Sequence, residues 1–453
     1  MHGSLASPLI EAKNTGFGWV AIVRIGLVQA SIGALVMLAT TVLNRLMVVE
    51  LGLLAAVPAG LVAWHYAVQL GRPLWGHASD KGNNRTRWII GGVAVLAAGG
   101  LLATQATVLM GSSFWLGFAL AVLAYSLIGA GVGAGGTSAL ALLASGVAPQ
   151  RRAAAAAVTW IMMVAGIVSS SFAVSALIDP FSFERLMVVA SGLALAMVTL
   201  TVIATVRLER QAGRFGNAAK DGTAPDFRAA LAEIWNEPAA RRFTVFIFVS
   251  MIAFSMQDLI LEPFAGLIFG MTPGQSTQLG GQHQSGILLG MIVTGIGGSA
   301  FSGKRPDGLR IWVVSGCLMS AAALGALGLA AVAGAGWPLG INVFVLGLGN
   351  GVFAVAAIGA MMGLAGAGKN TREGVRMGVW GASQAIAFGL GGLTGAVGVD
   401  LARRMLGADG AAFQLIFGIE AAAFLCAAIL AIRATGGAAM RASMQQSERE
   451  QFA

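Results

Sequence analysis

Charged side chains interrupt two apolar stretches of the sequence. Arg45 and Glu50 lie in TTVLNRLMVVELGL, and Asp258 and Glu262 lie in MQDLILEPFAGLIFGM. Charges inside a membrane are costly and tend to mark functional sites. The two carboxylates are four residues apart and share a helix face, where they repel each other unless a cation or a ligand intervenes. The pattern predicts a charge network in which Arg45 is the partner of Asp258 or Glu262.

Two further observations bear on this network. Five residues turn about 140° around a helix, which disfavours an ion pair between Arg45 and Glu50. A helix over residues 20–49 would be about 45 Å long, against a hydrocarbon core of about 30 Å. In the alternative interpretation, Arg45 therefore extends to the outer interface and Glu50 begins an outer loop. Pro263 lacks an N–H group and can kink the second stretch just after Glu262.

One histidine lies well inside an apolar segment in this reading of the sequence. His65 occurs in VAWHYAVQLG with Trp64 and Tyr66 beside it, whereas we assign His283 to an outer loop. A lone intramembrane histidine is more often hydrogen-bonded between helices than bound to a metal. Ligation by the His65 imidazole is the alternative.

Composition places the whole chain in a membrane. Of the 453 residues, 57% are hydrophobic and 10% are charged, against about 25% charged in soluble domains. Apolar stretches long enough to span a bilayer recur along the chain. The net charge of +9 does not indicate nucleic-acid binding, because the cations fall in short loops between spans. We find no nucleophile–base pair, phosphate loop or metal cluster, so we expect neither an enzyme nor a metal site.

The apolar runs predict an all-α integral membrane protein with twelve transmembrane helices in two pseudo-symmetric six-helix halves. The spans are predicted at 20–46, 57–74, 88–110, 116–143, 153–177, 186–206, 243–264, 285–301, 311–333, 341–364, 378–399 and 411–432. Residues 1–206 form the N-terminal half and 243–432 the C-terminal half. Between them, 207–242 form a cytoplasmic loop with an interfacial helix carrying Phe227, Leu231, Ile234 and Trp235. Residues 433–453 form a cytoplasmic tail.

The distribution of cations predicts the orientation. With a cytoplasmic N-terminus, 24 of the 28 Lys and Arg residues lie on the cytoplasmic side. Positive charge accumulates in cytoplasmic loops. Both termini are therefore predicted to be cytoplasmic.

The two halves resemble each other in sequence. LIGAGVG in span 4 matches VLGLGNG in span 10, with Gly129, Gly131 and Gly133 aligned to Gly347, Gly349 and Gly351 at an offset of 218 residues. Parallel six-span halves are the arrangement of major facilitator transporters. We predict that Gly129, Gly133, Gly347 and Gly351, with Gly391 and Gly395 of span 11, allow close helix packing.

The loop between spans 2 and 3, GHASDKGNNRTR, supports this class. Its spacing of Gly76, Asp80 and basic residues resembles the major facilitator signature. Asp80 can accept hydrogen bonds from Arg85 or Arg87, or cap a helix N-terminus. An ordinary solvated cationic loop is the alternative.

Three stretches carry a closer resemblance. LNRLMVVELG, QDLILEPFAGLIFGM and HYAVQLGRPLWGHASD are similar to the PucC/LhaA group, the bacteriochlorophyll delivery family of the major facilitator superfamily; Phe264, Ala265 and Gly266 depart from its usual Tyr-Gly-Gly. The resemblance implies a protein that handles bacteriochlorophyll or a late precursor in the bacterial inner (intracytoplasmic) membrane. Light-harvesting polypeptides or late biosynthetic enzymes are the implied partners. It makes His65 a candidate Mg ligand, with Trp64, Tyr66 and Gln257 as the other candidate pigment contacts in a slot between spans 1, 2 and 7.

Two other functions remain open at this point. One is a proton-coupled transporter of a small solute, with Asp258 and Glu262 as the protonatable pair. The other is a scaffold that binds antenna polypeptides and transports nothing. Few polar residues fall at mid-depth in spans 1, 4, 7 and 10, which disfavours a hydrophilic solute.

Overall fold

The computed structural model describes residues 16–72, 75, 84–148, 151–209, 238–302, 308–366 and 373–434, and the regular structure assigned in these ranges is helical. The first half contains α1 (Trp19–Met37), which continues as two π-helical turns, η1 (Leu38–Leu43) and η2 (Leu46–Glu50), and then α2 (Ala56–Gln69), α4 (Arg85–Met110), α5 (Phe114–Gly146), α6 (Arg152–Ile178) and α7 (Phe183–Thr205). The second half contains α9 (Pro238–Met256), the 3₁₀ turn η6 (Gln257–Leu259), α10 (Leu261–Phe269), α11 (Pro273–Ser302), α12 (Gly308–Ala333), α13 (Leu339–Gly366), α14 (Glu373–Leu406) and α15 (Asp409–Ala434).

These helices form a multi-pass membrane protein. Within the described ranges, nine helices are long and apolar enough to cross a bilayer, or ten if the pair bent by 40° at Leu259–Leu261 counts as one span. Two further segments complete the predicted order of twelve: α2 has 14 residues, and α11 is long but begins with a polar stretch. The eighth span was predicted to start at residue 285, and that boundary is wrong because α11 starts at Pro273.

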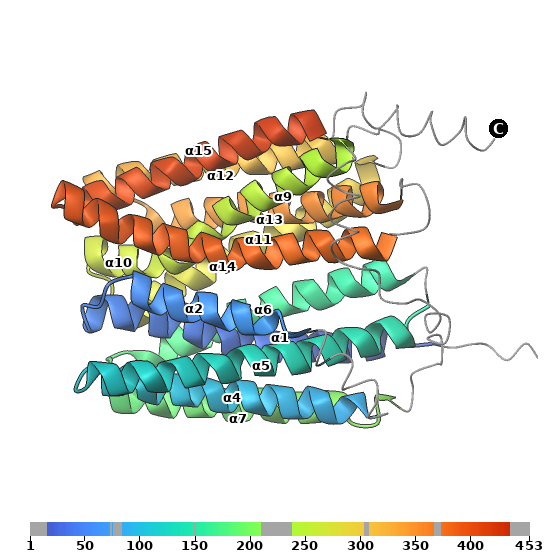
Figure 1. Cartoon of the computed structure of the whole chain (residues 1–453), viewed down its shortest axis with the longest axis horizontal. Coiled ribbons are helices and arrows are strands. Elements are labelled where there is room, and N and C mark those ends of the chain that lie inside the picture. Colours follow the sequence, from blue (N-terminus) through green and yellow to red (C-terminus); the bar gives the residue numbers. More distant parts are fainter. Residues whose placement is uncertain are drawn as a thin grey trace, which may run out of the picture.

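The helices pack as two groups that follow each other along the chain. Helices α1 to α7 contact one another, as do α9 to α15, and the groups meet where α6 packs against α11 and α2 packs against α14. Figure 1 shows the first group, blue to green, below the second, yellow to red. Most of the central loop, including its predicted interfacial helix, and residues 435–453 of the predicted tail lie outside the described residues. The exact domain boundaries therefore stay a prediction.

Glycine lets neighbouring backbones touch in both groups. At Gly129, Gly347, Gly351, Gly391 and Gly395, a Cβ atom would lie closer than 3.0 Å to a backbone atom of the adjacent helix. At Gly133 it would meet the Trp75 side chain at 3.1 Å. Lipid tails are as apolar as leucine, so helices in a bilayer associate through close packing instead of burial from water. These glycines therefore set the spacing of α2, α5, α9, α11, α13 and α14.

The alternating direction of the helices makes the orientation testable. Reporters fused at Gly3 and after Arg449 are expected to report the same, cytoplasmic side, because twelve spans return the chain to the side on which it began. Activity of a periplasmic reporter compared with that of a cytoplasmic one measures this. Opposite sides for the two fusions would contradict the span count, and a shared periplasmic side would reverse the topology.

Candidate functional site

Spans 1 and 7 both depart from the regular α-helix at the same end of the molecule. Span 1 ends in the π-helical turns η1 and η2, and span 7 breaks at η6 before it resumes as α10. Pro263 lies in the first turn of α10, where its missing N–H group is tolerated. The shorter helix α10 lies at the left-hand end of the molecule in Figure 1. π-Helical turns and broken membrane helices both occur preferentially at functional sites.

Arg45 forms an ion pair with Glu50, and the prediction that these residues do not pair is wrong. The Nη1 atom of Arg45 lies 2.5 Å from Glu50 Oε1. The reason is the π-helical turn: the N–H of Leu51 donates to the carbonyl of Leu46 at 3.0 Å, five residues back. In this geometry residues five apart lie above one another.

The predicted partners of Arg45 across the halves are also wrong. Arg45, with 3% of its surface exposed, forms neither its ion pair nor its hydrogen bond with Asp258 or Glu262. Its Nη2 atom instead donates to the backbone carbonyl of Met271 at 2.7 Å, just beyond α10. Arg45 still joins the two halves, because Met271 belongs to the second half, but it does so through a carbonyl.

Other polar contacts between the halves lie at this same end. The Asn44 amide donates to the carbonyl of Leu259 at 2.9 Å. Asp400 accepts from the N–H groups of Ala55 and Ala56 at 3.1 and 2.8 Å. Asp179 accepts from the Thr272 hydroxyl at 2.5 Å and from the Gly274 N–H at 3.2 Å. These residues lie near the turns that follow spans 1, 5, 7 and 11, so the predicted outer end is where polar bonds hold the halves together.

Span 7 carries buried polar atoms that have no partner. Gln257 is fully buried and both its amide atoms lack a hydrogen bond; Glu262 is 4% exposed and its Oε2 atom lacks one. The other oxygen of Glu262 points at Gly280 of α11, where a Cβ would lie 2.5 Å from it and 3.5 Å from the methyl group of Thr41. Asp258 is partly buried. Unpartnered polar groups in a membrane protein indicate a binding or switching site.

The junction has approximate two-fold symmetry, which the sequence offset shows. Asn44 and Glu262 are 218 residues apart, as are Thr41 and Leu259. Asn44 bonds to Leu259, and Glu262 lies next to Thr41 over Gly280. Equivalent positions of the two halves therefore meet each other across the pseudo-twofold axis.

His65 is buried and already hydrogen-bonded. Its Nε2 atom lies 2.7 Å from Gln69 Nε2, and Gln69 Oε1 in turn accepts from Arg72. Its ring packs edge-on against Tyr66 at 4.7 Å. Trp64 faces away, half-exposed, and donates to Ser126 at 2.8 Å. The structure thus places Trp64 away from His65 and brings Tyr66 against Phe388 of α14, with ring centroids 6.2 Å apart.

His283 is a second buried histidine, and its assignment to an outer loop is wrong. It lies in α11 with 3% exposure, and its Nε2 atom is 3.3 Å from the amide nitrogen of Asn350. Gln275, Gln278 and Gln282 give this part of α11 the composition of a loop. His283 follows His65 by 218 residues, and the carbonyls of the two histidines contact Gly347 and Gly129, which are also 218 apart. The offset alone could have identified His283 as the counterpart of His65.

At the opposite end, the start of α4 is capped by residues that we did not predict. Asn84 accepts from the N–H of Arg87 at 3.2 Å. Glu209 accepts from the N–H groups of Arg85 and Thr86 at 2.9 and 3.2 Å. Arg85 donates to Ser145 at 2.6 Å. Gly76 and Asp80 lie outside the described residues, so their role in the loop motif stays a prediction.

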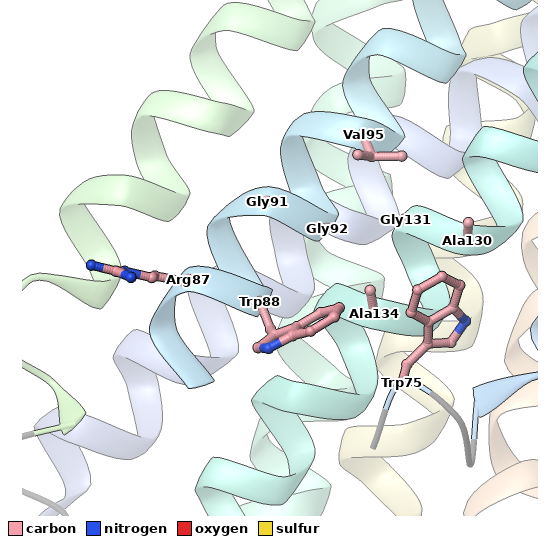
Figure 2. Close-up of a pocket in the computed structure, with 9 residues that line it drawn as sticks. All are labelled: Trp75, Arg87, Trp88, Gly91, Gly92, Val95, Ala130, Gly131 and Ala134. Atoms are coloured by element: carbon pink, nitrogen blue, oxygen red, sulfur yellow. The ribbon is translucent and has the colours of Figure 1, made fainter. Parts of the chain in front are cut away.

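A groove opens between α4 and α5 near this capped end. It has a volume of about 280 Å³, and its lining is apolar apart from Arg87. Trp75 and Trp88 stand on its walls with ring centroids 6.2 Å apart and planes inclined by 56°, and Figure 2 shows both indoles beside Gly131 and Ala134. Its wall is open at Gly91, where a Cβ atom would meet nothing within 4 Å.

The fold and the junction define a transporter-like membrane protein with the major facilitator architecture. Similar solved structures include the peptide transporter POT (TM-score 0.65, 14% identity, covering 93% of this chain and 96% of that one) and the nucleoside transporter NupG (0.62, 16%, 92% and 99%). At such identities the similarity concerns the fold alone. The model of the family described as PUCC protein matches residues 42–438, and the chain belongs to this family.

Named relatives cover nearly the whole chain. The Bacteriochlorophyll synthase 44.5 kDa chain of Rhodobacter capsulatus is 50% identical over 91% of this chain and 95% of its own length. Protein PucC of Cereibacter sphaeroides is 28% identical over 91% and 92%. The resemblance inferred from the motifs of spans 1, 2 and 7 is confirmed.

Proposed function

We propose that this protein binds bacteriochlorophyll or a late precursor and passes it on during the assembly of pigment–protein complexes, without catalysing a reaction on it. The observation that carries the proposal is its 50% identity to a protein named for bacteriochlorophyll synthesis. The transporter-like fold supports handling of a molecule over chemical conversion of it. The partners are light-harvesting polypeptides or late biosynthetic enzymes, in the intracytoplasmic membrane of a phototrophic bacterium.

The groove between α4 and α5 is the first candidate for pigment contact. A chlorophyll consists of a flat macrocycle and a long apolar tail, so it dissolves in the bilayer and can reach a lipid-facing groove laterally. Trp75 and Trp88 offer aromatic surface there, and Gly91 and Gly131 leave its floor without side chains. Aromatic rings gain additional energy from stacked or edge-on contacts.

Pigment binding is testable by purification from a pigment-producing host in mild detergent. The absorption spectrum of wild-type protein is expected to contain a pigment band, and Trp88→Ala is expected to lower the pigment-to-protein ratio several-fold because it removes one wall of the groove. Trp115→Ala is the matched control, because Trp115 is 78% exposed at the start of α5 and does not line the groove. Colourless wild-type protein would contradict the proposal, and antenna polypeptides co-purifying without pigment would favour the scaffold function.

His65 is the second candidate, as an axial ligand of Mg. Its Nε2 atom would have to leave Gln69 to bind the metal. In the same preparation, His65→Leu distinguishes the roles: a shifted or lost long-wavelength band supports ligation, whereas an unchanged band makes His65 a structural residue. Gln257, whose amide atoms lack partners, is the next candidate ligand.

A further inference from the structure

Glu420 is a carboxyl group inside the aromatic core of the second half. It lies on α15, one turn from Phe417 and one turn from Phe424, and all three residues are fully buried. Phe417 packs against Phe264 of α10 with ring centroids 5.0 Å apart, and Phe424 packs against Phe353 of α13 at 6.2 Å. Glu420 therefore occupies a position in a buried helical stripe that an apolar residue would be expected to fill.

Neither oxygen of Glu420 has a hydrogen-bond partner. Both Oε1 and Oε2 are inaccessible to solvent and unbonded. Leaving an ionised carboxylate unpaired in such surroundings costs far more than any interaction in this region could return, since desolvation of the charge is not compensated. A neutral carboxyl group avoids that cost.

The elements around α15 supply no cation for Glu420. On α14, Asp400 caps the turn before α2, and Arg403 pairs with Asp409 at 2.6 Å. On α10, Glu262 points at Gly280 of α11. Buried Cys317 is the titratable group well inside α12, and Arg310 lies at the start of that helix.

Asp258 is the charged residue whose electrostatic interaction reaches Glu420. It lies in η6, the break in span 7, next to Gln257, whose amide atoms are also buried and unbonded. Two carboxyl groups in range of each other cannot both ionise at low cost, because like charges in a poorly screened site repel. Such a pair holds at least one proton.

We propose that Glu420 and Asp258 form a proton-binding site in the second half, with Glu420 as the residue that holds the proton while the halves are closed at the Arg45 end. The residue after Asp258 is Leu259, whose carbonyl accepts the hydrogen bond from Asn44 of the first half. A change of charge at Asp258 therefore acts one residue away from a bond between the halves. This site does not depend on what the protein carries, and it is distinct from the groove and from His65.

Infrared spectroscopy of the full-length purified protein tests the site, because a protonated carboxyl group has a C=O stretching band apart from that of a carboxylate and shifts in heavy water. Wild type is expected to keep this band at pH values well above those at which an ordinary glutamic acid ionises. Glu420→Gln should lose it, while Glu184→Gln, an exposed glutamate in the first turn of α7, should retain it. Equal spectra of wild type and Glu420→Gln would overturn the proposal.

Two further measurements cover the other outcomes. If Glu420→Gln does not fold, Asp258→Asn serves instead: it removes the neighbouring charge and is expected to shift the band of Glu420, and an unshifted band would refute the coupling. Thermal unfolding in sodium and in choline chloride distinguishes a metal cation from a proton. Stabilisation by sodium that Glu420→Gln abolishes would make this a cation site and overturn the assignment of a proton.

Discussion

Replacing Arg45 with alanine is expected to produce one of the largest losses of stability available by a single substitution in this protein. The guanidinium group is buried, and it both pairs with Glu50 and donates to the carbonyl of Met271 in the other half. Removing it leaves those two acceptors without their donor. Breaking a buried pair by deleting one partner costs on the order of 3 kcal/mol, and partial exposure of the Glu50 side chain, 35%, reduces that figure. Folded yield in membranes and thermal unfolding of the purified protein measure the loss.

Second-site variants identify the partner of Arg45. Glu50→Gln should recover part of the loss in the Arg45→Ala background, because it removes the unpaired charge. Asp258→Asn should not, since Asp258 makes no ion pair with Arg45. Recovery by Asp258→Asn and not by Glu50→Gln would show that the pair in the membrane is the one we first predicted. Arg45→Lys is the conservative control: it keeps the charge but cannot reach two acceptors with a planar group.

Hydropathy and charge were sufficient to predict the architecture. Twelve apolar segments, the cation bias and the offset of 218 residues between Gly129 and Gly347 led to the major facilitator fold, which the solved structures confirm. The predicted boundaries were wrong where polar residues face the protein interior. The glutamines before His283 lie in α11 among other helices, and sequence-based hydropathy cannot distinguish such a helix from a loop.

The partners within the junction depended on local geometry that the sequence does not display. Whether Arg45 pairs with Glu50 depends on a π-helical turn, and an α-helical wheel places these residues apart. Glu420 was a different kind of omission. It is the one ionisable residue in the apolar run FQLIFGIEAAAFLCAAIL, so the signal that singled out Arg45 was also present there.

Substituting Gly347 with alanine is expected to separate α11 from α13, although it adds only one methyl group. A Cβ at Gly347 would overlap the backbone carbonyl of His283, and Gly286, Gly290 and Gly351 make the same kind of backbone contact along the two helices. A helical carbonyl cannot rotate away, so the helices must move apart and lose contacts over several turns. Overpacking of this kind costs about 1–3 kcal/mol. The control is Gly325→Ala on α12, where a Cβ meets nothing within 4 Å; it should be neutral or stabilising by up to about 1 kcal/mol, because alanine favours the helix. Thermal unfolding of the two variants in detergent compares them directly, and similar effects at both positions would show that Gly347 does not set the distance between α11 and α13.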